Sequence, residues 1–243
     1  MKVICIIQAR MGSSRLPGKV LKDIEGQTML ERVVKRVRQA KKISRLVVAT
    51  TIHPEDQRIV EECQRLETEC FRGSELDVLD RYYQTWRAFG GDTVVRITSD
   101  CPLIAPEIID QVIREFEIHD VDYASNVIES HDIRGLDVEV MKAGVLEKAW
   151  RESDQPHHRV HVTPYIYQNP DRFRLLEVPM GMGAHPFRLT VDTSEDLMLI
   201  RSIYAHFHNQ DALSAREVID FLIRNPDLAT SNSHIAQKKL EEL

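Results

Sequence analysis

The chain has 243 residues, 42% of them hydrophobic, which is enough for one large α/β domain with a sizeable core. Its formal net charge of -6 hides an asymmetry: residues 1–45 carry 12 Lys and Arg against 3 Asp and Glu, and the remainder carries 20 against 35. This charge balance disfavours a protein that binds nucleic acid over a whole face. The four cysteines form no C-x-x-C pair, and the first apolar run is too short for a signal peptide or a membrane span, so we expect reduced thiols, no membrane partner and a cytoplasmic protein.

The first apolar run, Val3–Ile7, leads directly into a loop of small residues and cations at positions 8–19. Small residues allow backbone N–H groups to approach phosphate oxygens, and Arg10, Arg15 and Lys19 can neutralise the remaining charge. We therefore predict a triphosphate-binding loop. The residues that form it, besides the three cations, are Ala9, Gly12, Ser13 and Ser14.

This loop differs from the common phosphate-binding motifs. Five residues separate Gly12 from Gly18 where a Walker A loop has four, Val20 replaces the hydroxyl residue that would hold magnesium, and no G-x-G-x-x-G is present. A solvated surface turn of the same composition is the alternative. The position of the loop after the first strand favours the phosphate interpretation, because ligands in open α/β sheets bind beyond the carboxyl ends of the strands.

Strand-like and helical segments then alternate, which predicts βαβ units around a mainly parallel sheet. Thr28 and Glu31 form a candidate capping box for the first helix. The cations of that helix and the turn after it are expected on a solvated face. Those cations are Arg32, Lys35, Arg36, Arg38, Lys41 and Lys42. The expected strands are Val3–Ile7, Leu46–Thr50, Glu69–Phe71 and Val94–Ile97, and the later helices span Asp77–Phe89 and Pro106 to about His119.

From about Asp122 the pattern loosens into shorter strands, Val138–Met141 and Arg174–Val178. We interpret residues 125–185 as a lobe inserted into a single domain of residues 1–243, serving substrate binding or dimerisation. A strand at Phe187–Val191 and helices from Ser194 and Ser214 complete the domain.

Two aspartates follow apolar strands, Asp100 after residues 93–97 and Asp192 after residues 188–191. Carboxylates at the ends of two such strands can share a magnesium ion that bridges triphosphate oxygens. Each could instead cap the following helix, and Asp192 is a fair N-cap candidate. Their joint occurrence with the loop favours a metal site.

A cluster of histidines invites a zinc interpretation, because His157 and His161 are four residues apart. Zinc needs a third ligand, and no fitting Glu or Cys pattern follows. We favour a polar loop in which His161 or Arg159 contacts substrate.

Six segments carry the motifs that distinguish this chain: Ile7–Lys19, Arg72–Leu79, Ser99–Leu103, Gly135–Glu139, His161–Tyr165 and Arg188–Asp192. Together they resemble the cytidylyltransferases that make CMP-linked sugar acids, the CMP-KDO and acylneuraminate synthetases, and among them the branch of the spore coat polysaccharide biosynthesis protein F type. The resemblance implies a three-layer, Rossmann-like nucleotidyltransferase fold of the GT-A-like kind, CTP and Mg²⁺ as ligands, and a homodimer.

The resemblance also implies a role for each matching residue. Arg10 and the Gly12–Ser14 backbone would hold the phosphates, with Arg15 and Lys19 neutralising them. Asp100 and Asp192 would carry magnesium. Arg72, Ser74 and Asp77 would lie near the nucleoside, and the substrate-binding candidates are Asp137, Glu139, Arg159, His161 and Arg188.

The sequence therefore predicts an enzyme that transfers CMP from CTP to a sugar acid or related acidic, hydroxylated substrate and releases pyrophosphate, in surface polysaccharide or glycoconjugate biosynthesis. Arg10, Arg15, Lys19 and Asp100 are the expected catalytic residues, and the loop and magnesium would act mainly by positioning and electrostatic stabilisation. Two alternatives remain: a metal-dependent glycosyltransferase of related architecture, and a nucleotide-binding module without chemistry.

Overall fold

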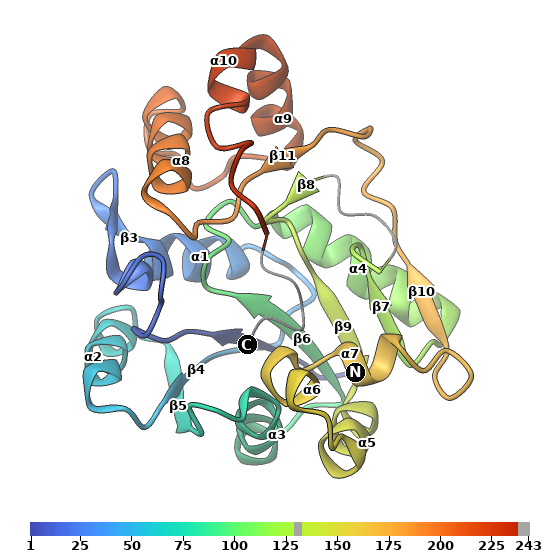
Figure 1. Ribbon diagram of the computed structural model, residues 1–243. Coiled ribbons are helices and arrows are strands. Elements are labelled where there is room, and N and C mark those ends of the chain that lie inside the picture. The colour runs from blue at the N-terminus through green and yellow to red at the C-terminus, as the bar shows by residue number, and fades with distance from the viewer. Residues whose placement is uncertain (129–132, 238–243) are drawn as a thin grey trace.

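The computed structural model describes residues 1–128 and 133–237 and contains a central seven-stranded sheet (Figure 1). β1 is parallel to both of its neighbours, β4 and β6, whereas β9 is antiparallel to β6 and β7. The predicted mainly parallel α/β sheet is confirmed. In sheet order the strands are β10 (Leu175–Glu177), β7 (Tyr123–Ser125), β9 (Glu139–Lys142), β6 (Thr93–Thr98), β1 (Val3–Gln8), β4 (Arg45–Thr51) and β5 (Glu69–Gly73).

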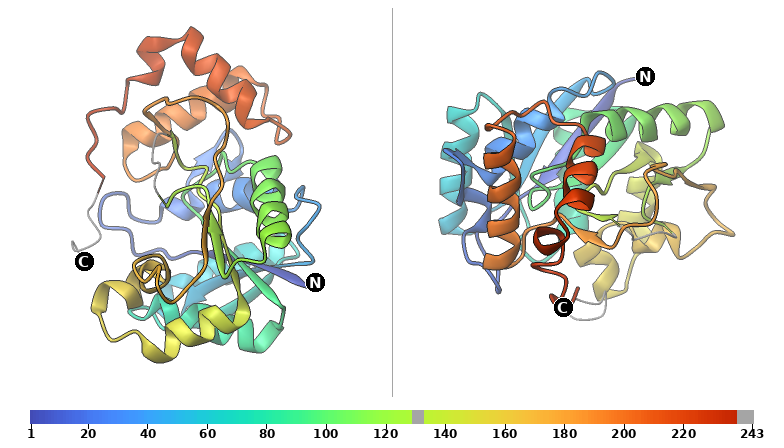
Figure 2. Two further views of the ribbon diagram at one scale, coloured as in Figure 1. Left: turned by 90° about the vertical axis from the view of Figure 1, so that its right-hand side faces the viewer. Right: turned by 90° about the horizontal axis from the view of Figure 1, so that it is seen from above.

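Helices cover both faces of this sheet, which makes three layers (Figures 1 and 2). Alternate residues of β1 show the division: Val3, Cys5 and Ile7 belong to one core cluster, and Ile4 and Ile6 belong to the other. The first cluster packs against α1 (Met29–Val37), α2 (Gln57–Arg65), α4 (Pro106–His119), α8 (Ser194–His206) and α9 (Ala215–Arg224). The second packs against α3 (Val78–Phe89), α5 (Ala143–Glu152), α6 (Pro156–His161) and α7 (Pro164–Tyr167).

Two short pairs of strands lie outside the main sheet. β11 (Phe187–Arg188) pairs in parallel with β8 (Ile133–Arg134), and the following Leu189 amide donates to the carbonyl of Arg134 at 2.8 Å. The strand predicted over Phe187–Val191 is therefore shorter than expected, and its partner is not in the central sheet. A hairpin of β2 (Asp23–Ile24) and β3 (Gln27–Thr28) precedes α1, and α10 (Pro226–Ala229) follows α9.

The segment predicted as an inserted lobe contributes directly to the central sheet. β9 lies between β6 and β7, and β10 forms the outer edge, so this part of residues 125–185 extends the sheet. α5, α6 and α7 cover one face of it (Figure 1). No helix in the described part of the chain is long and apolar enough to cross a membrane.

The predicted capping box of α1 is half present. Thr28 Oγ1 accepts a hydrogen bond from the Glu31 amide at 3.0 Å, but the Glu31 carboxylate turns to Lys35 and Arg65. Lys35 of the same helix and Arg65 of α2 therefore take the carboxylate that would have completed the box.

The prediction of a solvated basic face on α1 is wrong for two of its arginines, because Arg32 and Arg36 are fully buried. Arg36 donates to the backbone carbonyls of Ile104 and Leu213 at 2.7 Å and of Asp211 at 2.8 Å. Arg32 pairs with the Asp211 carboxylate at 2.8 Å. These acceptors lie far away in the sequence, so helical spacing alone did not reveal them.

Candidate active site

The predicted phosphate loop leaves β1 and doubles back before a short 3-10 helix, Lys19–Leu21. Gly18 adopts a left-handed conformation with φ of 66° and donates its amide to the Met11 carbonyl at 3.0 Å. The buried Asp56 carboxylate fixes the loop from below by accepting from the Met11 amide at 2.7 Å. Arg10 and Gly12 remain exposed above this anchor, where a ligand can reach them.

Lys19 brings the two predicted metal carboxylates together. Its ammonium donates at 2.8 Å to each of three acceptors: the Asp100 carboxylate, the Asp192 carboxylate and the Val191 carbonyl. The Val191 amide also donates to the Asp100 carbonyl at 2.8 Å, which ties the two aspartate segments to each other. The convergence of Asp100 and Asp192 expected from the sequence is therefore present, with a cation between them.

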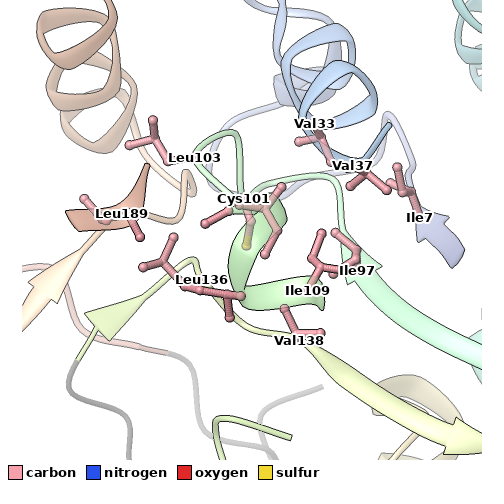
Figure 3. Packing of buried hydrophobic residues seen from close by; sticks show 14 of the residues in the cluster. Ile7, Val33, Val37, Ile97, Cys101, Leu103, Ile109, Leu136, Val138 and Leu189 are labelled. Atoms are coloured by element: carbon pink, nitrogen blue, oxygen red, sulfur yellow. The ribbon is translucent and has the colours of Figure 1, made fainter. Parts of the chain in front are cut away.

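Residues close in sequence to the two aspartates lie in the hydrophobic core (Figure 3). Leu136 and Leu189 pack with Cys101, the residue after Asp100, and all three are almost fully buried. Gly135 has φ of 97°, and a Cβ there would lie 2.5 Å from the backbone carbon of Leu189. The close approach of these two backbones fixes the segment that leads to Asp192.

The electrostatic interactions between Lys19, Asp100 and Asp192 favour the charged forms of the lysine and of Asp100. Burial on its own would lower the pKa of Lys19, but the charges of Asp100 and Asp192 outweigh it and the net shift is upward. Burial would likewise raise the pKa of Asp100, yet the neighbouring Lys19 ammonium holds that pKa at about 2. Asp100 is therefore an anion throughout the physiological pH range.

Asp192 receives two further cations. Arg15 Nη2 lies 2.8 Å and Arg188 Nη2 lies 2.7 Å from Asp192 Oδ2. Arg188 also donates through Nε to the fully buried Asp196 at 2.9 Å. Arg188, predicted to contact substrate, is thus placed as a brace for Asp192.

The helix-cap alternative for the two aspartates is wrong. Thr193 is the N-cap of α8, completed by Asp196, and Ala105 is the N-cap of α4. Asp100 and Asp192 precede these caps and direct their carboxylates to Lys19 instead.

The donor set fits a hard divalent cation. Two aspartate carboxylates already share one positive centre, and magnesium is commonly held by one or two carboxylates together with substrate phosphates. The described residues contain no group of three or more His, Cys, Asp or Glu side chains that could hold a metal without a ligand's help. Asp100 and Asp192 would therefore bind the metal jointly with the nucleotide.

The residues predicted near the nucleoside lie at the end of β5. Arg72 donates to the carbonyls of Thr51 and His53, both at 3.0 Å, so its guanidinium braces the turn after β4. Asp77 caps α3 by accepting from the Asp80 amide at 2.8 Å.

A second set of contacts holds the same turn. Ser74 Oγ accepts from the Asp77 amide at 3.0 Å, and Arg159 pairs with the Asp77 carboxylate at 2.5 Å. Ser74, Asp77 and Arg159 therefore support the shape of this end of the site.

The two remaining carboxylates of the predicted substrate site differ from each other. Glu139 is buried, paired with Arg96 and bonded to the Tyr123 hydroxyl at 3.0 Å, which gives it a structural environment. Asp137 accepts from the Gly135 amide at 3.3 Å, and burial is the main cause that raises its pKa to about 6. Asp137 is therefore the carboxyl of this region that titrates near neutrality.

The histidines do not assemble a metal site among the described residues. His158 is buried and its Nε2 lies 3.0 Å from the side-chain oxygen of Gln168, and His157 lies 3.5 Å from the same atom. His161, partly buried, ends α6. The prediction of a loop is wrong, because residues 156–161 form α6 and residues 164–167 form α7, and a substrate contact from His161 or Arg159 stays a prediction.

Sequence reasoning missed three residues of this region, Asp56, Asp196 and Arg81. Asp56 and Asp196 anchor the loop and Arg188 through contacts between distant segments, for which the sequence carries no signal. Arg81 is 1% exposed on α3, and a cation amid the apolar positions of that predicted helix was the available clue.

A loop with exposed small residues and cations, beside two carboxylates that share one cation, is an arrangement that suits a nucleoside triphosphate. The sequence model described as Cytidylyltransferase matches residues 4–219. The spore coat polysaccharide biosynthesis protein SpsF of Bacillus subtilis is 37% identical over 235 residues, which cover 94% of this chain and 97% of that protein. The chain belongs to the cytidylyltransferase family and is a CTP-dependent nucleotidyltransferase.

Solved structures agree with this assignment. A cytidylyltransferase from Leptospira borgpetersenii superposes with a TM-score of 0.90 at 31% identity, covering 98% of this chain and 100% of that one. A CMP-2-keto-3-deoxy-manno-octonic acid synthetase solved with CTP superposes with a TM-score of 0.67 at 20% identity, covering 85% and 100%. The second likeness shows the shared nucleotidyltransferase fold.

Proposed function

We propose that this enzyme transfers CMP from CTP to a hydroxyl group of a sugar acid or a related acidic, hydroxylated compound, with release of pyrophosphate. Two similar proteins support the acceptor class: one is named for CMP-keto-deoxy-octonic acid synthesis and the other for spore coat polysaccharide biosynthesis. We assign the product to surface polysaccharide or glycoconjugate synthesis on the same grounds. Following the resemblance of the motifs, we also propose a cytoplasmic homodimer with residues 137–180 at its interface or as a lid.

One observation carries the catalytic part of the proposal: the Lys19 ammonium lies 2.8 Å from both Asp100 and Asp192, next to the phosphate loop. Two carboxylates that share a cation at this point can hold Mg²⁺ against a triphosphate. A module that only bound a nucleotide would not need this pair of partly buried, braced carboxylates.

In the proposed reaction, an acceptor hydroxyl oxygen attacks the α-phosphorus of CTP in line. The new bond joins that oxygen to phosphorus as the hydroxyl proton passes to water, the bond from the α-phosphorus to the oxygen that bridges it to the β-phosphate breaks, and pyrophosphate leaves with the electron pair. Arg10, Arg15 and Lys19 supply positive charge to the phosphates, and the exposed Gly12 backbone permits close approach. A bound Mg²⁺ would stabilise the negative charge on the phosphate oxygens. No covalent intermediate with the enzyme is needed.

The acceptor's own carboxylate requires a cation near Asp100. Arg159 and Arg188 are paired with Asp77 and with Asp192 and Asp196, respectively. Arg134, on β8 and close enough to Asp137 to affect its pKa, is the cation we assign to the acceptor. This assignment follows from its partial burial beside the Gly135 segment.

Pyrophosphate release tests the proposal directly. The enzyme with CTP and Mg²⁺ should release pyrophosphate in proportion to an added acidic sugar, and the methyl ester of the same sugar should be a poor acceptor. Turnover of a finished nucleotide sugar without pyrophosphate would instead identify a glycosyltransferase. Binding of CTP with no turnover on any acid of the series would indicate a binding module.

A further inference from the structure

Arg81 of α3 is a buried cation with one buried donor unmatched. The residue is 1% exposed, and its Nη1 donates to the Ser74 carbonyl at 2.5 Å. Its Nε is buried with no hydrogen-bond partner, and no ion pair is formed by Arg81 within residues 1–128 and 133–237. Leaving a buried donor of a charged group unpaired is costly, so the site calls for a ligand or a compensating group.

Arg36, one of two other arginines that are fully buried among the described residues, shows what a structural guanidinium looks like in this protein. Its three nitrogens donate to four backbone carbonyls, two at 2.7 Å. Arg81 has one such acceptor. Arg36 thus uses its donors within the fold, whereas Arg81 has a donor that the fold does not use.

The surroundings of Arg81 add positive charge. Burial is the main cause that lowers its pKa, and the nearby Arg10 lowers the pKa further. Asp56 and Glu75 act in the opposite direction, but the Asp56 carboxylate already accepts from the amides of Met11 and Thr51. The buried Nε of Arg81 therefore has no acceptor among the described residues, and Glu75 acts on the guanidinium through its charge without a hydrogen bond to it.

Arg81 also lies at the end of the site where we expect the nucleobase of the bound nucleotide. A Cβ on Gly73, the last residue of β5, would lie 3.0 Å from Arg81 Cγ, so the side chain packs at the carboxyl end of that strand. Asp100 follows β6, three strands away in the order β6-β1-β4-β5. Three strand spacings amount to about 14 Å, so a nucleotide between Asp100 and Arg81 would lie across the ends of β1 and β4.

The phosphate loop connects these two ends. Gly12 faces the β5 end, because a Cβ on it would lie 3.8 Å from the Glu75 carboxylate. A triphosphate held on the loop and at Asp100 thus directs its nucleoside toward the turn of residues 73–77 and toward Arg81 beneath it.

We propose that Arg81 is a specificity-determining residue that reads the base of CTP by donating from its guanidinium to the O2 and N3 atoms of cytosine. Both atoms are acceptors, and a planar guanidinium can donate to two acceptors in one plane. In uracil, N3 carries a hydrogen, so its N–H group would face an N–H group of Arg81 and no hydrogen bond could form between them. The proposal rests on the proposed function only through the binding of CTP, and the identity of the acceptor does not enter it.

The test is a calorimetric comparison of CTP with 3-deaza-CTP, in which a C–H replaces N3, with Mg²⁺ present and no acceptor. The wild-type enzyme should bind CTP about 10- to 100-fold more tightly, the range for a buried polar group left unpaired. Arg81→Met should reduce this preference to about twofold or less, because the donor to N3 is gone. Arg87→Met, on the same helix with its guanidinium on the Tyr83 hydroxyl, is the matched control and should keep the wild-type preference.

Arg81→Lys is the variant expected to perturb folding least, since lysine keeps the positive charge and a donor for the Ser74 carbonyl. It should show an intermediate preference. A purely structural role would weaken both nucleotides equally and leave the ratio unchanged, and an unchanged ratio in either folded variant overturns the proposal. Since no acceptor is present, failure of the sugar-acid assignment would leave these ratios as they are, whereas wild-type enzyme that binds neither nucleotide would contradict both proposals.

Discussion

The two ends of the site differ in how their charges are matched. At the metal end, Lys19, Arg15 and Arg188 neutralise Asp100 and Asp192 through ion pairs of 2.7–2.8 Å. At the nucleoside end, Arg81 has one carbonyl acceptor and lies close to a second guanidinium. The protein itself organises the carboxylates proposed to hold the metal, whereas we propose that the other end of the site is completed by its ligand.

The largest expected effect on turnover comes from removing the carboxylate of Asp100 or of Asp192. Asp100→Asn and Asp192→Asn should each abolish magnesium-dependent turnover with the fold intact, because each change keeps the shape and removes a hard anionic ligand. The measurement is a magnesium titration of pyrophosphate release, with the exposed Asp171→Asn as control. Full activity of either variant at limiting magnesium would show that its carboxylate is no metal ligand.

Removing the cation between the carboxylates should have the next largest effect. Lys19→Ala should lower kcat/KM by about two orders of magnitude or more, because a desolvated cation beside a phosphate stabilises the transition state by several kcal/mol. Steady-state kinetics with CTP varied at saturating magnesium and acceptor provide the check. Turnover close to that of the wild type would show that the loop is not part of the active site.

A smaller effect should appear in stability at Asp137. Its pKa is raised from 3.8 to about 6, so as the pH rises from about 4 to 6 the unfolded chain loses this proton first and the folded state loses stability. Asp137→Asn does not titrate and should gain stability relative to the wild type over that window, by at most about 3 kcal/mol, less the solvent screening of a partly exposed group.

Thermal melts of the two proteins in magnesium-free buffer from pH 4 to 7 measure this difference. Asn keeps an acceptor for the Gly135 amide, so the comparison isolates the charge. A difference in melting temperature that stays constant with pH would refute the assignment of this titration to Asp137.

Much of the sheet could be predicted because its signals are local. The expected strand Val3–Ile7 and helix Pro106–His119 agree with β1 and α4 to within one residue, since apolar runs and a proline at a helix start are readable in sequence. The expected strand Phe187–Val191 shrank to two residues, because its backbone is held by contacts with Arg134 and Asp100 instead of a continuous ladder.

The same contrast applies to the site. Asp100 and Asp192 could be paired from sequence because each follows an apolar run, and their cation partner came from the predicted loop. The burial of Arg36 and the spare donors of Arg81 could not be foreseen, since they depend on which carbonyls from distant segments reach each guanidinium. Pairing across long sequence separation is information that only the assembled fold supplies.

The position of the metal in a crystal soaked with CTP and Mn²⁺, located by anomalous scattering, tests the account most directly. The account predicts a single strong peak between the carboxylates of Asp100 and Asp192, with the Lys19 ammonium displaced from its present position between them. A peak remote from both carboxylates, with Lys19 still bridging them, would contradict the assignment of this cluster as the catalytic metal site.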